Sequence, residues 1–140
     1  MLRIANGRVF DPQNGIHGEV WLKDGKVTAG PAVPDVQTVD AAGCAVLPGG
    51  VEIHSHVAGA KVNNGRIMCP EDHVNHFRQH TEIARAGCGY TVPTTFMTGY
   101  EYARLGYTTL FEAAVPPLTA RHAHEELRDI PILDAGCYTV

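Results

Sequence analysis

A chain of 140 residues is long enough for one modest domain but too short for a complete (β/α)8 barrel, which takes about 250 residues. The hydrophobic fraction of 44% fits a globular core, and a net charge of −4 argues against a nucleic-acid-binding surface. The sequence has no signal peptide and no membrane-spanning run, and its four cysteines form no C-x-x-C pair, so we expect a cytoplasmic protein with reduced thiols.

Residues 1–47 predict a small antiparallel β-unit, because short apolar runs alternate with turn signals. Asn6-Gly7 and Asp24-Gly25 have the sequence of type I′ hairpin turns, whose positive φ angles suit asparagine, aspartate and glycine. A further turn is expected over 11–15, where Asp-Pro is followed by Asn-Gly. Each of these turns would join two strands that are neighbours in the sequence.

Residues 48–56 predict a short apolar strand that ends in two histidines. Alternate side chains of a strand point to the same face, so His54 and His56 are expected to project together and Ile53 and Ser55 to the other side. Two imidazoles on one side of a strand end can bind one metal ion, and zinc is a favoured partner of neutral imidazole. The alternative is a pair that occurs by chance or only hydrogen-bonds; we favour the metal, because a rigid Pro-Gly-Gly turn precedes the pair and a polar loop follows it.

Residues 57–66 contain glycine and asparagine and predict a loop directly after the histidine pair. In (β/α)8 barrels, the loops that follow the strands carry the substrate contacts. Lys61, Asn63 and Arg66 are therefore candidate substrate-binding residues. An ordinary solvated loop is an equally good interpretation of the same three residues.

A helix is expected from Pro70 to about Arg85, since proline suits the first helical position and acidic residues follow it. It carries His73, His76 and His80, and the last two have the i, i+4 spacing that can chelate zinc. The metalloprotease pattern, however, needs a glutamate directly after the first histidine, and the chain has phenylalanine there. We therefore interpret these histidines as a solvated helix face.

Residues 48–140 alternate helix and strand signals, which predicts a parallel sheet and the first, incomplete part of a (β/α)8 barrel. Glu112 lies near the end of a predicted strand, and we interpret it as a paired structural residue. The chain stops inside a strand-like run, so we expect it to be the N-terminal piece of a longer protein. Beyond residue 85, the predicted elements are a helix from Thr98 to Leu105, a strand over 107–115, a helix over 120–128 and a strand that begins at Ile130.

The order of a small β-unit, a Pro-Gly turn, an acid-containing strand and His54-Ser55-His56 resembles the entrance to the barrel of the amidohydrolase superfamily. Within that superfamily the chain looks like the A subunits of formylmethanofuran dehydrogenase, and the related A subunits of bacterial formyltransferase/hydrolase complexes share the pattern. The segments that carry this resemblance are 49–63, 70–73, 93–103, 106–117, 120–127 and 130–134.

The resemblance implies a small β-sandwich unit over 1–47, followed over 48–140 by the first strands and helices of a metal-dependent (β/α)8 barrel that the chain truncates. It implies an enzyme that interconverts N-formylmethanofuran and water with formate and methanofuran in one-carbon metabolism and methanogenesis. That enzyme would work inside a complex with other subunits, with no nucleic-acid partner and no membrane span. The family site holds two zinc ions, and His54 and His56 match two of its ligands.

The rest of the family's ligand set has no counterpart in this chain. None of Lys23, Lys26 and Lys61 stands at the position of the carboxylated lysine that bridges the two metals. The later histidines, and the aspartate that accepts a proton, are expected beyond Val140. The resemblance therefore implies no catalytic residue within this chain and no activity of the chain alone.

Two other functions are compatible with parts of the sequence. A cyclic-amide hydrolase of the dihydroorotase or hydantoinase type shares the β-unit and the His-x-His strand, but residues 57–117 fit that group poorly. A non-catalytic scaffold protein of the same complex would keep the barrel and lose the metal. The lysine, histidines and aspartate expected further along the chain would distinguish an enzyme from a scaffold.

Overall fold

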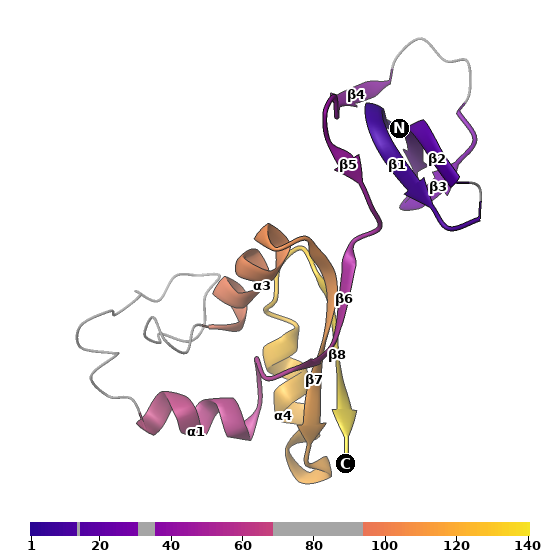
Figure 1. The fold of residues 1–140 in the computed structure, drawn as a ribbon. Coiled ribbons are helices and arrows are strands. Elements are labelled where there is room, and N and C mark those ends of the chain that lie inside the picture. The colour runs from indigo at the N-terminus through magenta and orange to yellow at the C-terminus, as the bar shows by residue number, and fades with distance from the viewer. Residues whose placement is uncertain (14, 31–35, 69–93) are drawn as a thin grey trace. The chain divides into compact units, whose positions relative to one another are not determined.

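The computed structural model describes residues 1–13, 15–30, 36–68 and 94–140, which form two compact units, Met1–Pro48 and Gly49–Val140 (Figure 1). The helix predicted over 70–85, with His73, His76 and His80, lies outside the described residues. Within the described part of the chain, no helix is long and apolar enough to cross a membrane.

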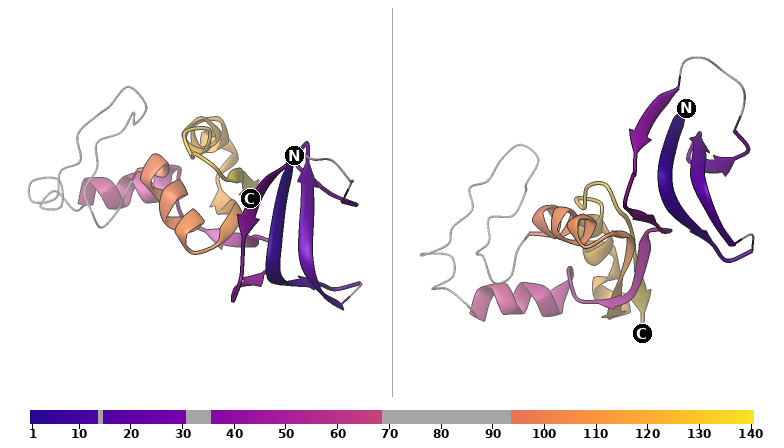
Figure 2. Two further views of the ribbon diagram at one scale, coloured as in Figure 1. Left: turned by 90° about the horizontal axis from the view of Figure 1, so that it is seen from above. Right: turned by 45° about the horizontal axis from the view of Figure 1, so that its top comes forward.

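The described residues of the first unit form one sheet, with strand order β3-β2-β1-β4 and with β5 also paired to β1 (Figure 2). β1 pairs with β2, and β2 with β3, in antiparallel fashion, as the turn signals predicted. β4 and β5 pair with β1 in parallel. The strands are β1 (Leu2–Asp11), β2 (Gly15–Lys23), β3 (Lys26–Thr28), β4 (Gln37–Asp40) and β5 (Ala45–Val46).

The prediction of a purely antiparallel unit is therefore wrong for β4 and β5. Their pairing is non-local, with Leu2 opposite Gln37, and a parallel pair needs a crossover connection that leaves no two-residue turn signal in the sequence. The part of this unit that the structure describes is also a single sheet, so the two packed sheets of a sandwich are not seen in it.

Of the two predicted type I′ turns, Asp24-Gly25 and Asn6-Gly7, only the first is a turn in the structure. Asp24-Gly25 is the predicted hairpin turn: both residues have positive φ angles, 51° and 74°, and Lys23 pairs with Lys26. Asn6-Gly7 is not a turn, because β1 runs through it with an irregular register between Ala5 and Val9. Asn6 has the positive φ of 63° that its signal predicted, but a Cβ atom on Gly7 would lie 2.7 Å from Val46, so glycine here allows β5 to approach.

In the second unit, the described residues form a parallel sheet with strand order β6-β7-β8. This confirms the parallel sheet predicted from the alternation of helix and strand. Helix α3 packs against β7 and helix α4 against β8, and Figure 1 shows both helices on the same side of the sheet. The elements are β6 (Gly50–Ser55), α1 (Ala60–Met68), α3 (Thr95–Arg104), β7 (Tyr107–Val115), η1 (Pro117–Thr119), α4 (Ala120–Leu127) and β8 (Asp134–Thr139).

Element boundaries in this unit follow the prediction at β7 and α4 and depart from it elsewhere. Helix α3 begins at Thr95 rather than Thr98, because the Thr94 side chain caps it by accepting a hydrogen bond from the Met97 amide at 3.1 Å. Gly106 ends this helical segment with a φ of 90°, as expected. The third strand begins at Asp134 rather than Ile130, whose side chain is buried in the core instead.

The predicted loop over 57–66 is wrong, since helix α1 begins at Ala60. Its sequence contains Asn63, Asn64 and Gly65, which are weak helix formers. Contacts of Asn63 and Arg66 with Glu126 of α4 stabilise the helix despite this local preference. Tertiary contacts of this kind leave no trace in a single sequence.

One apolar cluster holds the second unit together and covers the helix side of its sheet. Leu110 of β7 is fully buried at its centre. The opposite face is open in the described residues: Val51 and Ile53 of β6 are 57% and 63% exposed. The cluster consists of Val57, Ala58, Leu110, Leu127 and Ile130.

A candidate metal centre at the end of β6

The end of β6 contains a bulge. Glu52 pairs with Leu110 and Ser55 with Glu112, so three steps along β6 match two along β7. A bulge interrupts the alternation of side chains. Ile53 is accordingly exposed, whereas Ser55 is buried and donates a hydrogen bond to the Phe111 carbonyl oxygen at 2.8 Å. The prediction that Ile53 and Ser55 share one face is therefore wrong.

His54 and His56 do come together, as the sequence predicted. Their ring centroids lie 5.4 Å apart and the ring planes are inclined by 80°. Two imidazole nitrogens bound to one zinc ion at about 2.1 Å, in tetrahedral geometry, would place the ring centroids about 5 Å apart. Both side chains are exposed, so an ion could reach them. The geometry of the pair thus fits two ligands of one metal ion.

Each histidine has a hydrogen bond to a carboxylate, His54 to Glu52 of the same strand and His56 to Glu112 of β7. The backbone N–H of His54, inside the bulge, donates to Glu52 Oε1 at 2.9 Å. The ring of His56 contacts Glu112, with Nδ1 2.9 Å from Oε1. The interpretation of Glu112 as a paired residue was correct, but the sequence did not identify its partner. An acidic residue inside an apolar strand was the available signal.

Glu112 lies under the chain that leaves β6. It is 1% exposed, and its second oxygen accepts hydrogen bonds from the backbone N–H groups of Val57 and Ala58, the latter at 3.0 Å. One carboxylate therefore contacts both the histidine and the segment that follows it. The Nδ1 edge of the His56 ring is accordingly directed toward Glu112 of β7.

The three candidate substrate-binding residues lie on α1 rather than in a loop. Asn63 donates from Nδ2 to Glu126 Oε1 of α4 at 2.6 Å, and Arg66 donates to Asn63 Oδ1 at the same distance. Glu126 also accepts a hydrogen bond from the Gly59 amide at 3.0 Å. Asn63 and Arg66 therefore join α1 to α4, and these hydrogen bonds direct them to that helix rather than to the histidine pair.

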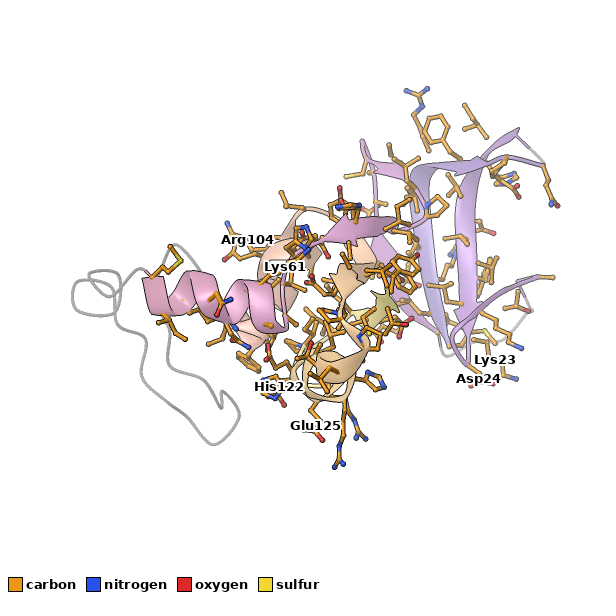
Figure 3. The ribbon with its side chains drawn as sticks, turned by 90° about the horizontal axis from the view of Figure 1, so that it is seen from below. Lys23, Asp24, Lys61, Arg104, His122 and Glu125 are labelled. Atoms are coloured by element: carbon orange, nitrogen blue, oxygen red, sulfur yellow. The ribbon has the colours of Figure 1, made fainter. Side chains whose placement is uncertain are left out.

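Lys61 is in a different position from the other two. It lies in the first turn of α1, at the end that follows β6, and its side chain is exposed (Figure 3). It borders a small hollow together with Glu112 and Ala114. Of the three candidates, Lys61 is the one that borders the same hollow as a residue of the histidine site.

Within the described residues, no group of three or more histidine, cysteine, aspartate or glutamate side chains is arranged to hold a metal ion. Zinc normally takes four ligands, of which a catalytic site supplies three from protein. His54 and His56 alone would leave it underligated. The arrangement is consistent with one strand's contribution to a larger centre.

A parallel sheet with helices on one face, and with two adjacent histidines at the end of its first strand, has the order of elements of the opening part of a (β/α)8 barrel, in which the strand ends carry the functional residues. Residues 37–138 match the model of the amidohydrolase family, and the chain belongs to that family. It is 51% identical over 135 residues to protein FwdA of Methanocaldococcus jannaschii, covering 94% of this chain and 23% of that protein. It is 43% identical over 140 residues to the A subunit of the formyltransferase/hydrolase complex Fhc of Methylorubrum extorquens, covering 97% of this chain and 24% of that one.

Solved structures agree with this placement. The crystal structure of the Methylorubrum extorquens formyltransferase/hydrolase complex with methylofuran matches at a TM-score of 0.79, with 39% identity over 99% of this chain and 25% of the other. A D-hydantoinase matches at a TM-score of 0.60 and 21% identity, covering 99% of this chain and 26% of the other, which shows the fold alone. The chain thus has a mixed α/β amidohydrolase fold and spans about a quarter of the length of its curated relatives.

Proposed function

We propose that the protein is the amidohydrolase subunit of a formylmethanofuran dehydrogenase, a zinc-dependent enzyme that interconverts N-formylmethanofuran and water with formate and methanofuran. The observation that carries this proposal is the 51% identity to FwdA across 94% of the chain. The match extends through residues 57–117, the part of the sequence that fits cyclic-amide hydrolases poorly. The closely related bacterial formyltransferase/hydrolase subunit supports the same class of substrate.

In this proposal His54 and His56 hold one zinc ion of a dinuclear centre. Their ring separation of 5.4 Å supports the assignment. Zinc supplies Lewis acidity for the attack of water on a formamide carbonyl group. Glu52 and Glu112 hold the two histidines in place, through the His54 amide and the His56 ring. The remaining ligands and the proton-accepting group are not assigned to any residue of this chain.

Of the three candidate substrate-binding residues, we propose that Lys61 contacts the substrate directly. Lys61 is exposed at the border of the hollow that Glu112 also lines, so its side chain can extend toward a bound molecule. Asn63 and Arg66 would act on the site through α1, which they hold against Glu126. We also propose that the protein assembles with other subunits, since the matched Methylorubrum structure is a complex, and that it works in the cytoplasm.

The test is an assay of the protein at its natural length, purified with its partner subunits. We expect release of formate from N-formylmethanofuran and about two zinc ions per chain by elemental analysis. His54→Ala and His56→Ala should each lower the zinc content and abolish the release of formate. His124→Ala, which removes an exposed histidine of α4, is the matched control and should change neither.

Three results would contradict the proposal in different ways. Hydrolysis of dihydroorotate or a hydantoin, without hydrolysis of the formamide, would favour a cyclic-amide hydrolase. Absence of both zinc and activity from the intact complex would favour a non-catalytic scaffold. Unchanged zinc content in both histidine variants would reject His54 and His56 as ligands.

A further inference from the structure

Among the described residues, the carboxylate of Glu112 hydrogen-bonds to three consecutive residues, His56, Val57 and Ala58. Oε1 is 2.9 Å from His56 Nδ1, and Oε2 accepts from the amides of Val57 and Ala58. The residue is 1% exposed, so water does not compete for these bonds. Within the part of the chain that the structure describes, His56 is the side chain that hydrogen-bonds to this carboxylate.

This contact determines which nitrogen of His56 can bind a metal. A carboxylate can only accept hydrogen bonds, so the hydrogen between the two groups belongs to His56 Nδ1. A neutral imidazole carries one N–H, and its other nitrogen then has a free lone pair. His56 Nε2 is therefore the nitrogen that is available to an ion, on the side of the ring away from Glu112.

The backbone contacts of Glu112 make that choice rigid. Burial of a carboxylate is unfavourable unless donors surround it, and here two of the three donors are main-chain N–H groups. Rotation of the side chain away from His56 would break those bonds as well. Glu112 thus holds the His56 ring at Nδ1. The sheet positions Glu112 in turn, since Ser55 and Glu112 are paired across β6 and β7.

We propose that Glu112 is a positioning residue for the metal centre: it fixes the tautomer and the ring orientation of His56 and strengthens Nε2 as a ligand. The inference rests on the proposed function, because it takes His56 as a zinc ligand. Carboxylates that accept from the second nitrogen of a metal-bound histidine act in this way, and their loss weakens metal binding about 10- to 100-fold.

The test compares two glutamates that contact the same stretch of backbone, and it uses the protein at its natural length. Glu112 and Glu126 each accept an amide hydrogen from residues 57–59, but Glu112 also contacts His56. We expect Glu112→Gln to weaken zinc binding about 10- to 100-fold in a chelator competition. Glu126→Gln should leave the zinc dissociation constant unchanged. The visible spectrum of the cobalt-substituted protein should shift only in the Glu112 variant.

Two further variants keep the outcome decisive. Glu112→Asp retains the charge but shortens the side chain, and it should bind zinc with intermediate affinity; it also replaces Glu112→Gln if that variant does not fold. In a His56→Ala background, Glu112→Gln should cause no further loss of zinc. Equal zinc affinity in wild type, Glu112→Gln and Glu112→Asp would overturn the positioning role. If His56→Ala itself retained zinc, the proposed metal site would fail instead.

Discussion

The carboxylate of Glu52 accepts a hydrogen bond from the backbone N–H of His54, two residues further along the same strand, at 2.9 Å. The bulge takes this amide out of the regular pairing between β6 and β7. Glu52 supplies the acceptor that the neighbouring strand does not. The position of His54 therefore depends on a side chain of its own strand.

We expect Glu52→Ala to loosen the end of β6, because it leaves the His54 amide without this acceptor. The loss of one such hydrogen bond is worth about 1 kcal/mol, or about a fivefold change in local opening. Hydrogen–deuterium exchange of the 53–56 segment should become faster by that factor. Glu52→Gln keeps an acceptor oxygen and should exchange at the wild-type rate; equally fast exchange in both variants would contradict the role of the hydrogen bond.

We expect Gly99→Ala to destabilise the packing of α3. A Cβ atom at Gly99 would lie 2.5 Å from Pro131 Cδ and 2.8 Å from the Pro131 carbonyl oxygen, and neither the ring nor the backbone can move aside easily. Overpacking of this kind costs about 1–3 kcal/mol. Gly18→Ala is the control, since nothing lies within 4 Å of its added Cβ. Thermal unfolding should show a lower midpoint for Gly99→Ala alone.

The pKa of Tyr102 should lie above its usual value of 10.0, first because the side chain is partly buried and second because Glu52 is nearby. The folded state therefore disfavours the ionised phenol. The stability that the folded state gains while the Tyr102 phenol stays neutral is fully present below pH 10.0. It is lost as the pH rises through the raised pKa of Tyr102. The difference in tyrosinate absorbance between wild type and Tyr102→Phe should have its midpoint above 10.0. A midpoint at or below that value would contradict the expectation.

We expect the 140-residue chain, expressed alone, to show no formamide hydrolase activity. His54 and His56 alone leave a zinc ion underligated, and β6 and β8 are the open edges of the sheet described in the second unit. Open edges favour association with other chains, so size-exclusion chromatography should find oligomers or aggregates. Turnover of N-formylmethanofuran by a monomer of this chain would reject both expectations.

Local signals were sufficient where a single short-range cause decides the structure. Strand β7 was predicted with the bounds it has, because a run of β-branched and aromatic residues stands between Gly106 and Pro116. Asp24-Gly25 was predicted because only a few residues adopt the positive φ angles of a type I′ turn. The proximity of His54 and His56 was predicted from the two-residue period of a strand.

Contacts between residues that are distant in the chain could not be predicted from the sequence. Helix α1 contradicts the propensity of Asn63, Asn64 and Gly65, and contacts with Glu126 help to stabilise it. The bulge in β6 follows from the register with β7, which no pattern within β6 reveals. The partner of Glu112 was missed for the same reason, because two residues on neighbouring parallel strands share no local signal.

The separation of His56 and Glu112 by 56 residues has a consequence for the order of events during synthesis. Closing so long a segment is opposed by chain entropy, and parallel pairing is slow to form. Until β7 has docked beside β6, the imidazole of His56 has no carboxylate to select one tautomer. With His56 as a zinc ligand, as proposed, ribosome-bound chains that end before residue 107 should capture zinc poorly, and metal loading would be a late step in the maturation of the protein.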